Sequence, residues 1–372
     1  MVLDMRDLCI IDQPEMLADF CNNMRAMAVP WLAFDTEFIR ERTYYPQLCL
    51  IQVAVPGQLV CIDPLTLPSL DPLITILYDQ SVPKIAHAVH QDLEIFFHLF
   101  GAVPGPIFDT QLAALLLGMG SQIGYAALVR QQLGVTLTKA YTRVNWCQRP
   151  LASEWLDYAA DDVRYLGEIY IRQSKILRER GWLEALKEDF LALTDPNRYR
   201  LNPQELWRRI RNKTRFSREK QVVLRALAAW REEKASYYNR PRRWIIDDTV
   251  LIDLAHRLPE TLVDLYSIHG LSNIIYQSYG IALLDQIATA RREPPESWPM
   301  QASDYRHHLS RKQAVLVDDL LNLVAVRAHR YNIKPHDIAD RCDIECLVSG
   351  GDSKILHGWR RTLIGKELST WL

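Results

Sequence analysis

The chain has 372 residues, enough for two or three domains, and its formal net charge is only −1. Its 48% hydrophobic and 24% charged residues are typical of a soluble globular protein, and its longest apolar runs are too short for a membrane span. The N-terminus carries acids where a secretory signal would be basic and then apolar, so we expect a cytoplasmic protein.

The first 190 or so residues alternate strand-like and helix-like segments. Short apolar runs bounded by Pro, Gly or polar residues predict strands at 31–38, 47–55, 58–63 and 83–89. Helical spacing of apolar residues predicts helices at 69–78 and 90–100, and a further helix from Ser153 to about Glu179. Asp109 ends a short extended run and is suited to cap a helix that starts at Gln111. This alternation predicts an α/β domain, a sheet layered with helices.

The pattern changes to helices alone from Ser217 onward. An amphipathic helix is expected at 218–236, and shorter helices at 247–258 and 259–268. The segment 292–303 is rich in proline and polar residues, as linkers are, and a second helical region follows from about Tyr305. We therefore expect all-α domains after the α/β domain.

The charges are distributed unevenly, because the first 200 residues are net acidic and the rest net basic. Between Arg208 and Arg243 there are 13 lysine and arginine residues against three acids. Aromatic residues are interleaved with this basic stretch: Trp207, Phe216, Trp230, Tyr237, Tyr238 and Trp244. A solvated helical face is one explanation. We favour contact with nucleic acid, since basic surface with aromatic side chains suits phosphates and bases.

The seven cysteines are dispersed and include no C-x-x-C pair. A zinc ribbon or a disulfide framework is therefore not expected, and reduced, buried thiols are the better interpretation.

Acidic residues stand out on elements that are otherwise built to be buried. Asp35 and Glu37 lie at i and i+2 of a predicted strand, so their side chains leave the same face. Tyr158 and Asp162 lie at i and i+4 of a predicted helix and also share a face. Asp92 opens another helix. Each feature alone has an ordinary explanation: an edge strand for the first, a helix surface for the second, and a helix-dipole partner for Asp92.

Taken together, the four acids need counter-charge. Two like charges about 4 Å apart repel by about 4 kcal/mol at an effective dielectric near 20. Two divalent ions roughly 3.5–4 Å apart would offset this repulsion, and all-oxygen ligands favour Mg²⁺ or Mn²⁺. Such a pair activates water and stabilises the leaving oxygen in a displacement at phosphorus. A nearby tyrosine can orient that water by hydrogen bonding.

The segments FDTEF, HAVHQDLEIF and RPLASEWLDYAADDVRYL, in this order and spacing, resemble the three exonuclease motifs of the ribonuclease D family. The resemblance covers roughly residues 5–190 and implies a mixed, ribonuclease H-like sheet flanked by helices. It places the chain in the tyrosine subgroup of proofreading-type 3′→5′ exonucleases. By resemblance Asp35, Glu37, Asp92 and Asp162 are metal ligands for two divalent ions, Mg²⁺ or Mn²⁺. Tyr158 is by resemblance the residue that positions the attacking water.

Neighbouring titratable residues are left outside the predicted site. The family pattern selects Asp162 over the adjacent Asp161, which lies about a third of a helical turn away. Asp109 is explained by its capping role. His87 and His90 are interpreted as structural.

The second half of the chain resembles the HRDC modules that ribonuclease D shares with certain helicases, closely over 224–272 and more weakly near the C-terminus. The predicted division is an exonuclease domain (1–192), a connector (193–213), an HRDC domain (214–292), a linker (293–303) and a second HRDC-like domain (304–372).

The resemblance implies a metal-dependent 3′→5′ exoribonuclease that releases nucleoside 5′-monophosphates, with 3′-extended tRNA precursors as substrates. No membrane and no obligate protein partner are implied. Two alternatives stay open at this point: a 3′→5′ exodeoxyribonuclease that uses the same site, and a non-catalytic RNA-binding scaffold.

Overall fold

The computed structural model describes residues 8–138, 141, 144–211, 216–299 and 309–371. The chain forms two compact units. The first comprises Met1–Ile39, Gln47–Tyr199 and His308–Leu372, and the second comprises Arg40–Pro46 and Arg200–His307. None of the helices in the described parts of the chain has both the length and the apolarity that a membrane span requires.

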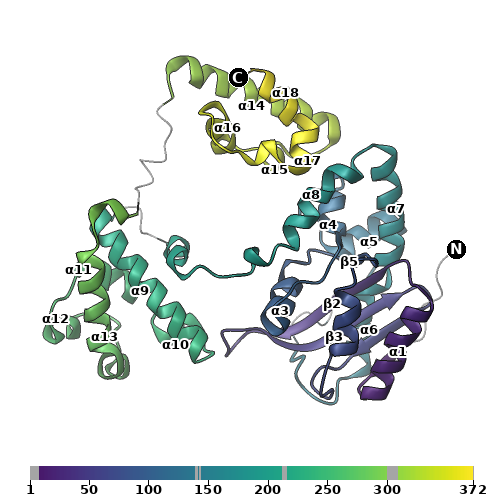
Figure 1. The fold of residues 1–372 in the computed structure, drawn as a ribbon, viewed down its shortest axis with the longest axis horizontal. Helices are drawn as coiled ribbons and strands as arrows, with labels where there is room; N and C mark the ends of the chain where they lie inside the picture. Colours follow the sequence, from purple (N-terminus) through teal and green to yellow (C-terminus); the bar gives the residue numbers. More distant parts are fainter. Residues whose placement is uncertain (1–7, 139–140, 142–143, 212–215, 300–308, 372) are drawn as a thin grey trace. The chain divides into compact units, whose positions relative to one another are not determined.

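A mixed sheet lies within the first unit (Figure 1). It has six strands in the order β1-β4-β3-β2-β5-β6. The strands β2, β3 and β4 form an antiparallel meander, whereas β1 pairs with β4, β5 with β2 and β6 with β5 in parallel. The strands are β1 Leu8–Ile11, β2 Leu32–Ile39, β3 Gln47–Val55, β4 Gln58–Ile62, β5 Lys84–Ala86 and β6 Ile107–Asp109. The predicted mixed sheet is therefore confirmed.

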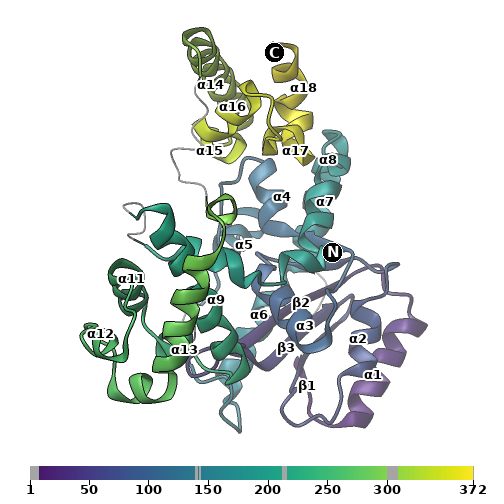
Figure 2. The same ribbon diagram turned by 60° about the vertical axis from the view of Figure 1, so that its left-hand side comes forward.

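Helices cover both faces of this sheet (Figure 2). They are α1 Pro14–Ala26, α2 Asp71–Leu77, α3 His90–Phe100, α4 Thr110–Leu116, α5 Tyr125–Leu133, α6 Ser153–Arg164, α7 Leu166–Glu179 and α8 Leu183–Leu193. On one face Ala33, Leu50 and Ala54 share a core with the buried side of α6. On the other face Phe34 and Ile51 share a second core with α1 and α3. This alternation along β2 directs Asp35 and Glu37 to the α6 face.

The prediction of a single helix from Ser153 to Glu179 is wrong, because the helix is interrupted at Tyr165, between α6 and α7. The backbone N–H of Tyr165 donates to the hydroxyl of Tyr125, 3.3 Å away. Two residues later Gly167 lies so close to the Trp31 indole that a Cβ atom there would collide with the ring. These tertiary contacts override the continuous helical pattern of the sequence.

The prediction of reduced thiols is wrong for one pair of cysteines. Cys49 on β3 and Cys147, 98 residues later, are joined by a disulfide. The other five cysteines are free thiols, but only Cys21 and Cys61 are buried as predicted; the rest are exposed or half-buried. No spacing rule pairs residues so far apart, because the fold alone brings them together.

The C-terminal helices belong to the first unit. They are α14 Arg311–Tyr331, α15 Pro335–Ile338, α16 Arg341–Val348, α17 Gly358–Arg360 and α18 Lys366–Leu368, with the short turns η4 Lys354–Leu356, η5 Arg361–Gly365 and η6 Ser369–Trp371. They share a hydrophobic core with α8, and the backbone N–H of Trp359 donates to Asp189 Oδ2 of α8 at 3.0 Å. A separate bond runs from Asn332 Nδ2 to the carbonyl of Gly118, at 2.7 Å.

The second unit is helical, as predicted. Its helices are α9 Arg218–Tyr237, α10 Arg242–Ile245, α11 Asp248–Arg257, α12 Leu262–Tyr266 and α13 Asn273–Arg292, with η2 Pro203–Arg209 and η3 Pro295–Ser297; η1 Pro196–Arg198 lies at the end of the preceding segment of the first unit. The loop 40–46, which joins β2 to β3, packs into this unit, since Tyr44 is part of its hydrophobic core.

Candidate active site

Strand β2 carries two of the predicted site residues. In the antiparallel pairing with β3, Asp35 lies opposite Gln52 and Glu37 lies opposite Leu50. The register shifts between Glu37 and Phe38, as at a β-bulge. Bulges bend a strand and redirect side chains, and they are frequent beside active sites. Asp35 and Glu37 are half-buried, whereas Phe34 and Thr36, which flank Asp35, are buried.

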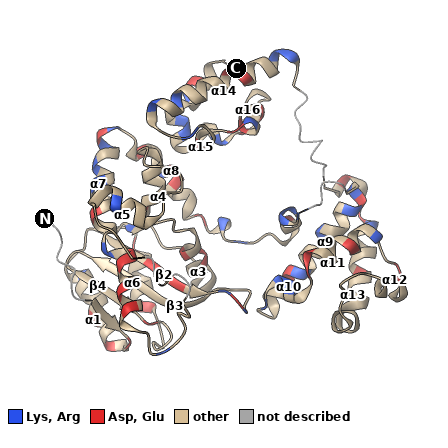
Figure 3. Ribbon diagram, turned by 180° about the vertical axis from the view of Figure 1, so that it is seen from behind, with Lys and Arg blue, Asp and Glu red and all other residues tan. Residues whose placement is uncertain are grey.

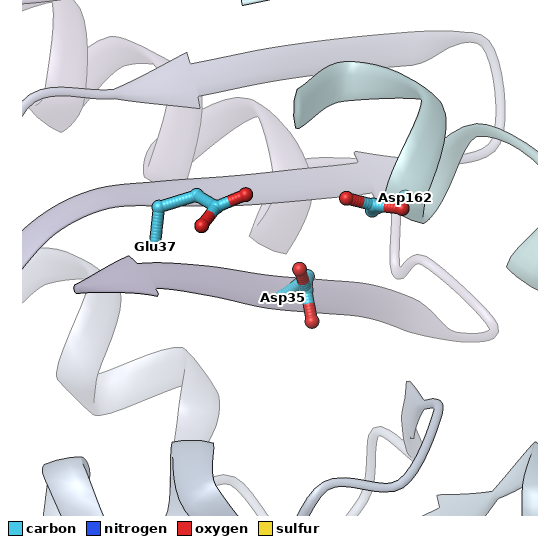
Figure 4. Close-up of side chains that lie close together, drawn as sticks. All are labelled: Asp35, Glu37 and Asp162. Carbon is cyan, nitrogen blue, oxygen red and sulfur yellow. The ribbon is translucent and has the colours of Figure 1, made fainter. Parts of the chain in front are cut away.

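Helix α6 carries the other two residues of this face. Its small and apolar side chains Ala159, Ala160 and Val163 are buried, which lets the helix lie close to the sheet. Oxygen atoms of Asp35, Glu37 and Asp162 all lie within 4.8 Å of one another. Figure 4 shows these three carboxylates side by side. The structure therefore brings together three acids that are up to 127 residues apart in the chain.

Asp92, the fourth predicted acid, has a different position. It is buried in the first turn of α3 and accepts a hydrogen bond from the Thr36 hydroxyl. It contributes no oxygen to the group of three. Its charge nevertheless raises the pKa of Asp35. The charge of Asp92 thus acts on the pKa of Asp35, while the Asp92 carboxylate is held by the hydrogen bond from Thr36 of β2.

The electrostatics of the site oppose ionisation of all four acids. Burial, followed by the charges of Asp92, Asp162 and Glu37, raises the pKa of Asp35 well above its ordinary value. Burial and the neighbouring carboxylates raise the pKa of Glu37 to about 8 and that of Asp162 to about 7. Burial also raises the pKa of Asp92 to about 6. Figure 3 shows acidic residues along β2 and α6.

This donor set fits a divalent cation. The ligand atoms are carboxylate oxygens, which Mg²⁺ and Mn²⁺ prefer, and the charges that act on Asp35 are those of other carboxylates. The adjacent acid is engaged elsewhere, because Asp161 Oδ1 accepts from Arg164 Nε at 2.7 Å. A bound cation would lower the raised pKa values and stabilise the clustered carboxylates.

Tyr158 lies beside the acids and is held by aromatic packing. Its ring is stacked on Trp146, with 6.3 Å between the centroids, and meets Tyr141 edge-on at 5.9 Å. Burial and then the charges of Asp162, Glu37 and Asp35 raise the pKa of Tyr158 to about 12. The phenol is therefore protonated at neutral pH. It can orient a water molecule by hydrogen bonding but cannot act as a base.

The residues left outside the site have structural roles. Asp109 caps α4 by accepting from the backbone N–H groups of Gln111 and Leu112, as predicted. Both ring nitrogens of His87 are engaged, Nδ1 with Thr110 Oγ1 and Nε2 with the carbonyl of Ile123, each at 2.9 Å.

Sequence reasoning missed three residues around the acids. Thr36 has the strand position between the two acids, and only the structure shows its bond to Asp92. Gln52 is completely buried opposite Asp35, and neither polar atom of its amide has a hydrogen-bond partner among the described residues. Trp146 supports Tyr158. A polar residue in the apolar run LCLIQVAV was the one sequence signal available for Gln52.

Comparisons with known proteins identify the family. A family model described as 3′-5′ exonuclease matches residues 8–178, and an HRDC domain model matches residues 220–287. A ribonuclease D from Sphingobium indicum is 39% identical over 370 residues, covering 96% of this chain and 92% of its own. The chain belongs to the ribonuclease D family. By this membership it is a 3′–5′ exoribonuclease.

Further ribonuclease D relatives agree along the whole chain. The protein from Pseudomonas paraeruginosa is 36% identical over 363 residues, covering 95% of this chain and 94% of its own. The crystal structure of Escherichia coli RNase D, described as an exoribonuclease involved in structured RNA processing, is similar with a TM-score of 0.85 and 30% identity, covering 98% of both chains. The expected resemblance and fold class are confirmed.

Proposed function

We propose that this chain removes nucleotides one at a time from the 3′ end of RNA, releasing nucleoside 5′-monophosphates, with two divalent ions, Mg²⁺ or Mn²⁺. Asp35, Glu37, Asp92 and Asp162 would hold the ions, and Tyr158 would position the attacking water. The observation that carries this proposal is the approach of three carboxylates to within 4.8 Å of one another. When bound, such ions supply Lewis acidity at the reacting phosphate and at the attacking water.

The protein side chains have distinct tasks in this scheme. Asp35, Glu37 and Asp162 provide the shared oxygen cluster, while Thr36 fixes the carboxylate of Asp92 next to it. The protonated phenol of Tyr158 donates a hydrogen bond to the water or accepts one from it, and its stacking on Trp146 limits its rotation. Holding the water in a fixed orientation lowers the entropic cost of bringing it into position to attack.

For the substrate we propose tRNA precursors with extra 3′ nucleotides. Support comes from the ribonuclease D relatives and from the structured RNA named for the Escherichia coli protein. We propose the cytoplasm as the location and no obligate protein partner. We also keep the predicted domain boundaries as a proposal, supported by the HRDC match at 220–287.

The test is a hydrolysis assay on a 3′-extended tRNA, with Mg²⁺, with Mn²⁺ and with a chelator, and with mass spectrometry of the products. We expect nucleoside 5′-monophosphates in the presence of either ion and none with the chelator. The variant Asp35→Asn should be inactive while keeping its fold by circular dichroism. Product release that survives both the chelator and Asp35→Asn would show that another site is responsible.

A matched DNA oligonucleotide serves as the control for substrate class. The carboxylates themselves do not distinguish ribose from deoxyribose. Faster loss of RNA than of the equivalent DNA supports the proposal, whereas equal or faster loss of DNA would assign the site to an exodeoxyribonuclease.

A further inference from the structure

The second unit contains a cavity of about 540 Å³ that the catalytic scheme does not use. Five arginines line it, from the loop 40–46, η2, α9 and α10. They are Arg40, Arg209, Arg231, Arg242 and Arg243. We propose that this cavity binds the phosphodiester backbone of single-stranded RNA, at nucleotides of the strand that lie away from its reacting 3′ end. The inference rests on the proposed function, because it gives the same substrate a second contact.

Two of the four acids that line the cavity form ion pairs with its arginines, and a third is held by a backbone hydrogen bond. Glu232 is buried and accepts hydrogen bonds from Arg242, including one from Nη2 at 2.6 Å, and another from the Tyr44 hydroxyl. Asp248 pairs with Arg231 Nη1 at 2.6 Å. Asp247 caps α11 by accepting from the backbone N–H of Thr249 at 2.9 Å. Of the four lining acids, these three already have partners, and the remaining one is Glu41.

The basic groups have donors left over. Arg209 and Arg243 are exposed and form no ion pair with any described residue. Arg231 is only 6% exposed, yet its Nε has no hydrogen-bond partner in the described parts of the chain. A buried guanidinium donor without a partner is costly, and guanidinium groups match phosphate oxygens well. Because the cavity has arginine donors without partners, it favours an anion over a cation or an apolar ligand.

The loop 40–46 fixes one wall of this cavity. The backbone N–H groups of Tyr44 and Tyr45 both donate to Asn239 Oδ1, at 3.0 and 3.1 Å, and Arg242 lies over the Tyr44 ring. Tyr44 is 5% exposed. The cavity is thus a built feature with an anchored loop.

Exposed aromatic rings close in sequence to the arginines favour RNA over a free phosphate. Of the six aromatics predicted to accompany the basic stretch, Trp207, Phe216 and Trp230 are buried in the helical core and cannot stack on bases. Tyr237, Tyr238 and Trp244 are exposed, to 81%, 46% and 49%. Trp244 immediately follows Arg243 in α10. A ring that can stack on a base is therefore next in sequence to a guanidinium that can donate hydrogen bonds to a phosphate. Figure 3 shows basic residues along α9 and α10.

The test measures binding, not hydrolysis. The full-length chain is titrated, in the presence of a chelator, into a fluorescently labelled single-stranded RNA at several salt concentrations. We expect the double variant Arg209→Ala/Arg243→Ala to bind about tenfold more weakly. The salt slope should fall by about 1 to 1.5, because each phosphate of a single strand that is no longer neutralised lowers it by about 0.7. Trp244→Ala should weaken binding without changing the salt slope.

The matched control is Arg292→Ala. Arg292 is an exposed arginine of the same unit that lines a different, smaller cavity, and its removal should leave RNA affinity unchanged. An affinity and a salt slope in the double variant that match those of the unaltered chain would overturn the proposal. Equally weakened binding in the control and the double variant would do so as well, since it would show a general charge effect.

Two further arms identify the source of the phosphate. Inorganic phosphate and a nucleoside 5′-monophosphate are tested as competitors of the labelled RNA. Competition only at millimolar concentrations supports an RNA backbone site, whereas competition at micromolar concentrations would assign the cavity to a free nucleotide or phosphate. A chain that binds RNA here but hydrolyses nothing would refute the proposed function alone. A hydrolysing chain whose affinity ignores these arginines would refute this site alone.

Discussion

Glu37 holds its carboxyl group in surroundings that oppose its charge. Burial and the charges of Asp162 and Asp92 raise its pKa from an ordinary 4.5 to about 8. A group whose pKa is raised by folding contributes its full stability below the unfolded value and loses it as the pH rises through the folded value. The metal-free fold is therefore weakened by this residue between pH 4.5 and 8.

We predict that Glu37→Gln stabilises the metal-free protein at pH 8. Glutamine fills similar space and cannot ionise, so the gain should be about 1–2 kcal/mol, a rise in Tm of about 3–6 °C, and should almost vanish at pH 5. The measurement is thermal unfolding with a chelator at the two pH values. Added Mg²⁺ should stabilise the unaltered protein more than the variant.

The control for this experiment is Glu154→Gln, an exposed residue in the first turn of α6 that is outside the cluster. Its Tm should change by less than about 1 °C at either pH. A Glu37 variant with the same Tm as the unaltered protein at pH 8 would contradict the idea that clustered carboxylates destabilise the metal-free site.

Tyr158 is predicted to act through its hydroxyl alone. In Tyr158→Phe the ring and its stacking on Trp146 are kept, so the site should retain its shape. Loss of the hydrogen bond to the water should lower kcat by about 100-fold, while Mg²⁺ binding, followed by thermal shift, stays unchanged. Unaltered turnover, or an abolished response to Mg²⁺, would contradict the assigned role. Tyr165→Phe, three residues beyond Asp162, is the matched control and should keep full turnover.

Periodicity alone predicts which of the candidate site residues share a face, whereas their proposed roles come from the family resemblance. A spacing of two on a strand places Asp35 beside Glu37, and a spacing of four on a helix places Asp162 beside Tyr158. Cross-strand register is a different matter. The opposition of Asp35 and Gln52 depends on how β2 and β3 pair, and a single sequence does not specify that pairing.

At the scale of elements, Asp109 organises a strand end and a helix start together. Its Oδ1 accepts from the backbone N–H of Gln111 at 2.8 Å and from that of Ala88 at 3.1 Å, and its Oδ2 accepts from the N–H of Val89 at 3.1 Å. Ala88 has a φ of 56°. These bonds explain why the strand predicted at 83–89 ends at Ala86, since the following N–H groups turn toward a side chain.

We predict that Asp109→Ala destabilises the protein by about 2–4 kcal/mol, because it removes a helix cap and leaves the buried N–H of Val89 without an acceptor. Urea unfolding measures the loss. Asp109→Asn keeps one acceptor oxygen and should cost less. Asp195→Ala is the matched control, since Asp195 caps a short exposed turn with a single bond to the N–H of Asn197, and it should cost under about 1 kcal/mol. Equal destabilisation by the two alanine variants would contradict this account.

Element prediction worked where the pattern was long and apolar. Strands β2, β3 and β4 and helix α3 lie within a residue or two of their predicted positions. Strand β1, with four residues, and helix α5 gave no sufficient periodic signal and were not predicted. The break between α6 and α7 depends on contacts of Tyr165 and Gly167 with distant residues, which local spacing cannot reveal.

At the scale of the whole molecule, contacts between segments far apart in the chain determine features of the fold that the sequence alone does not predict. The disulfide between Cys49 and Cys147 and the packing of the loop 40–46 into the helical unit both join segments far apart in the chain. The C-terminal helices provide a third example, because they attach to α8 through a shared apolar core and through the bond from Trp359 to Asp189. Helical composition was evident from the sequence, but the partner of each helix was not.

The docking of the C-terminal helices gives the last prediction. Gly358 opens α17 with a φ of +53°, a conformation that disfavours other residues, and the next N–H, that of Trp359, donates to Asp189 Oδ2 at 3.0 Å. A Cβ atom at this position would collide with the Asp189 carboxylate. Gly358→Ala should therefore detach α17 from α8, cost about 3 kcal/mol and make the segment around the buried Trp359 sensitive to proteolysis.

Gly350→Ala separates the two contributions to this destabilisation. Gly350 has a φ of +77° but open space around it, so alanine there should add backbone strain alone, about 1 kcal/mol, without new cleavage sites. Urea unfolding and limited trypsin digestion, followed by mass spectrometry, compare the two variants. If both are equally destabilised and neither is cleaved near residue 359, then Asp189 does not hold the C-terminal helices, and their shared apolar core with α8 must suffice by itself.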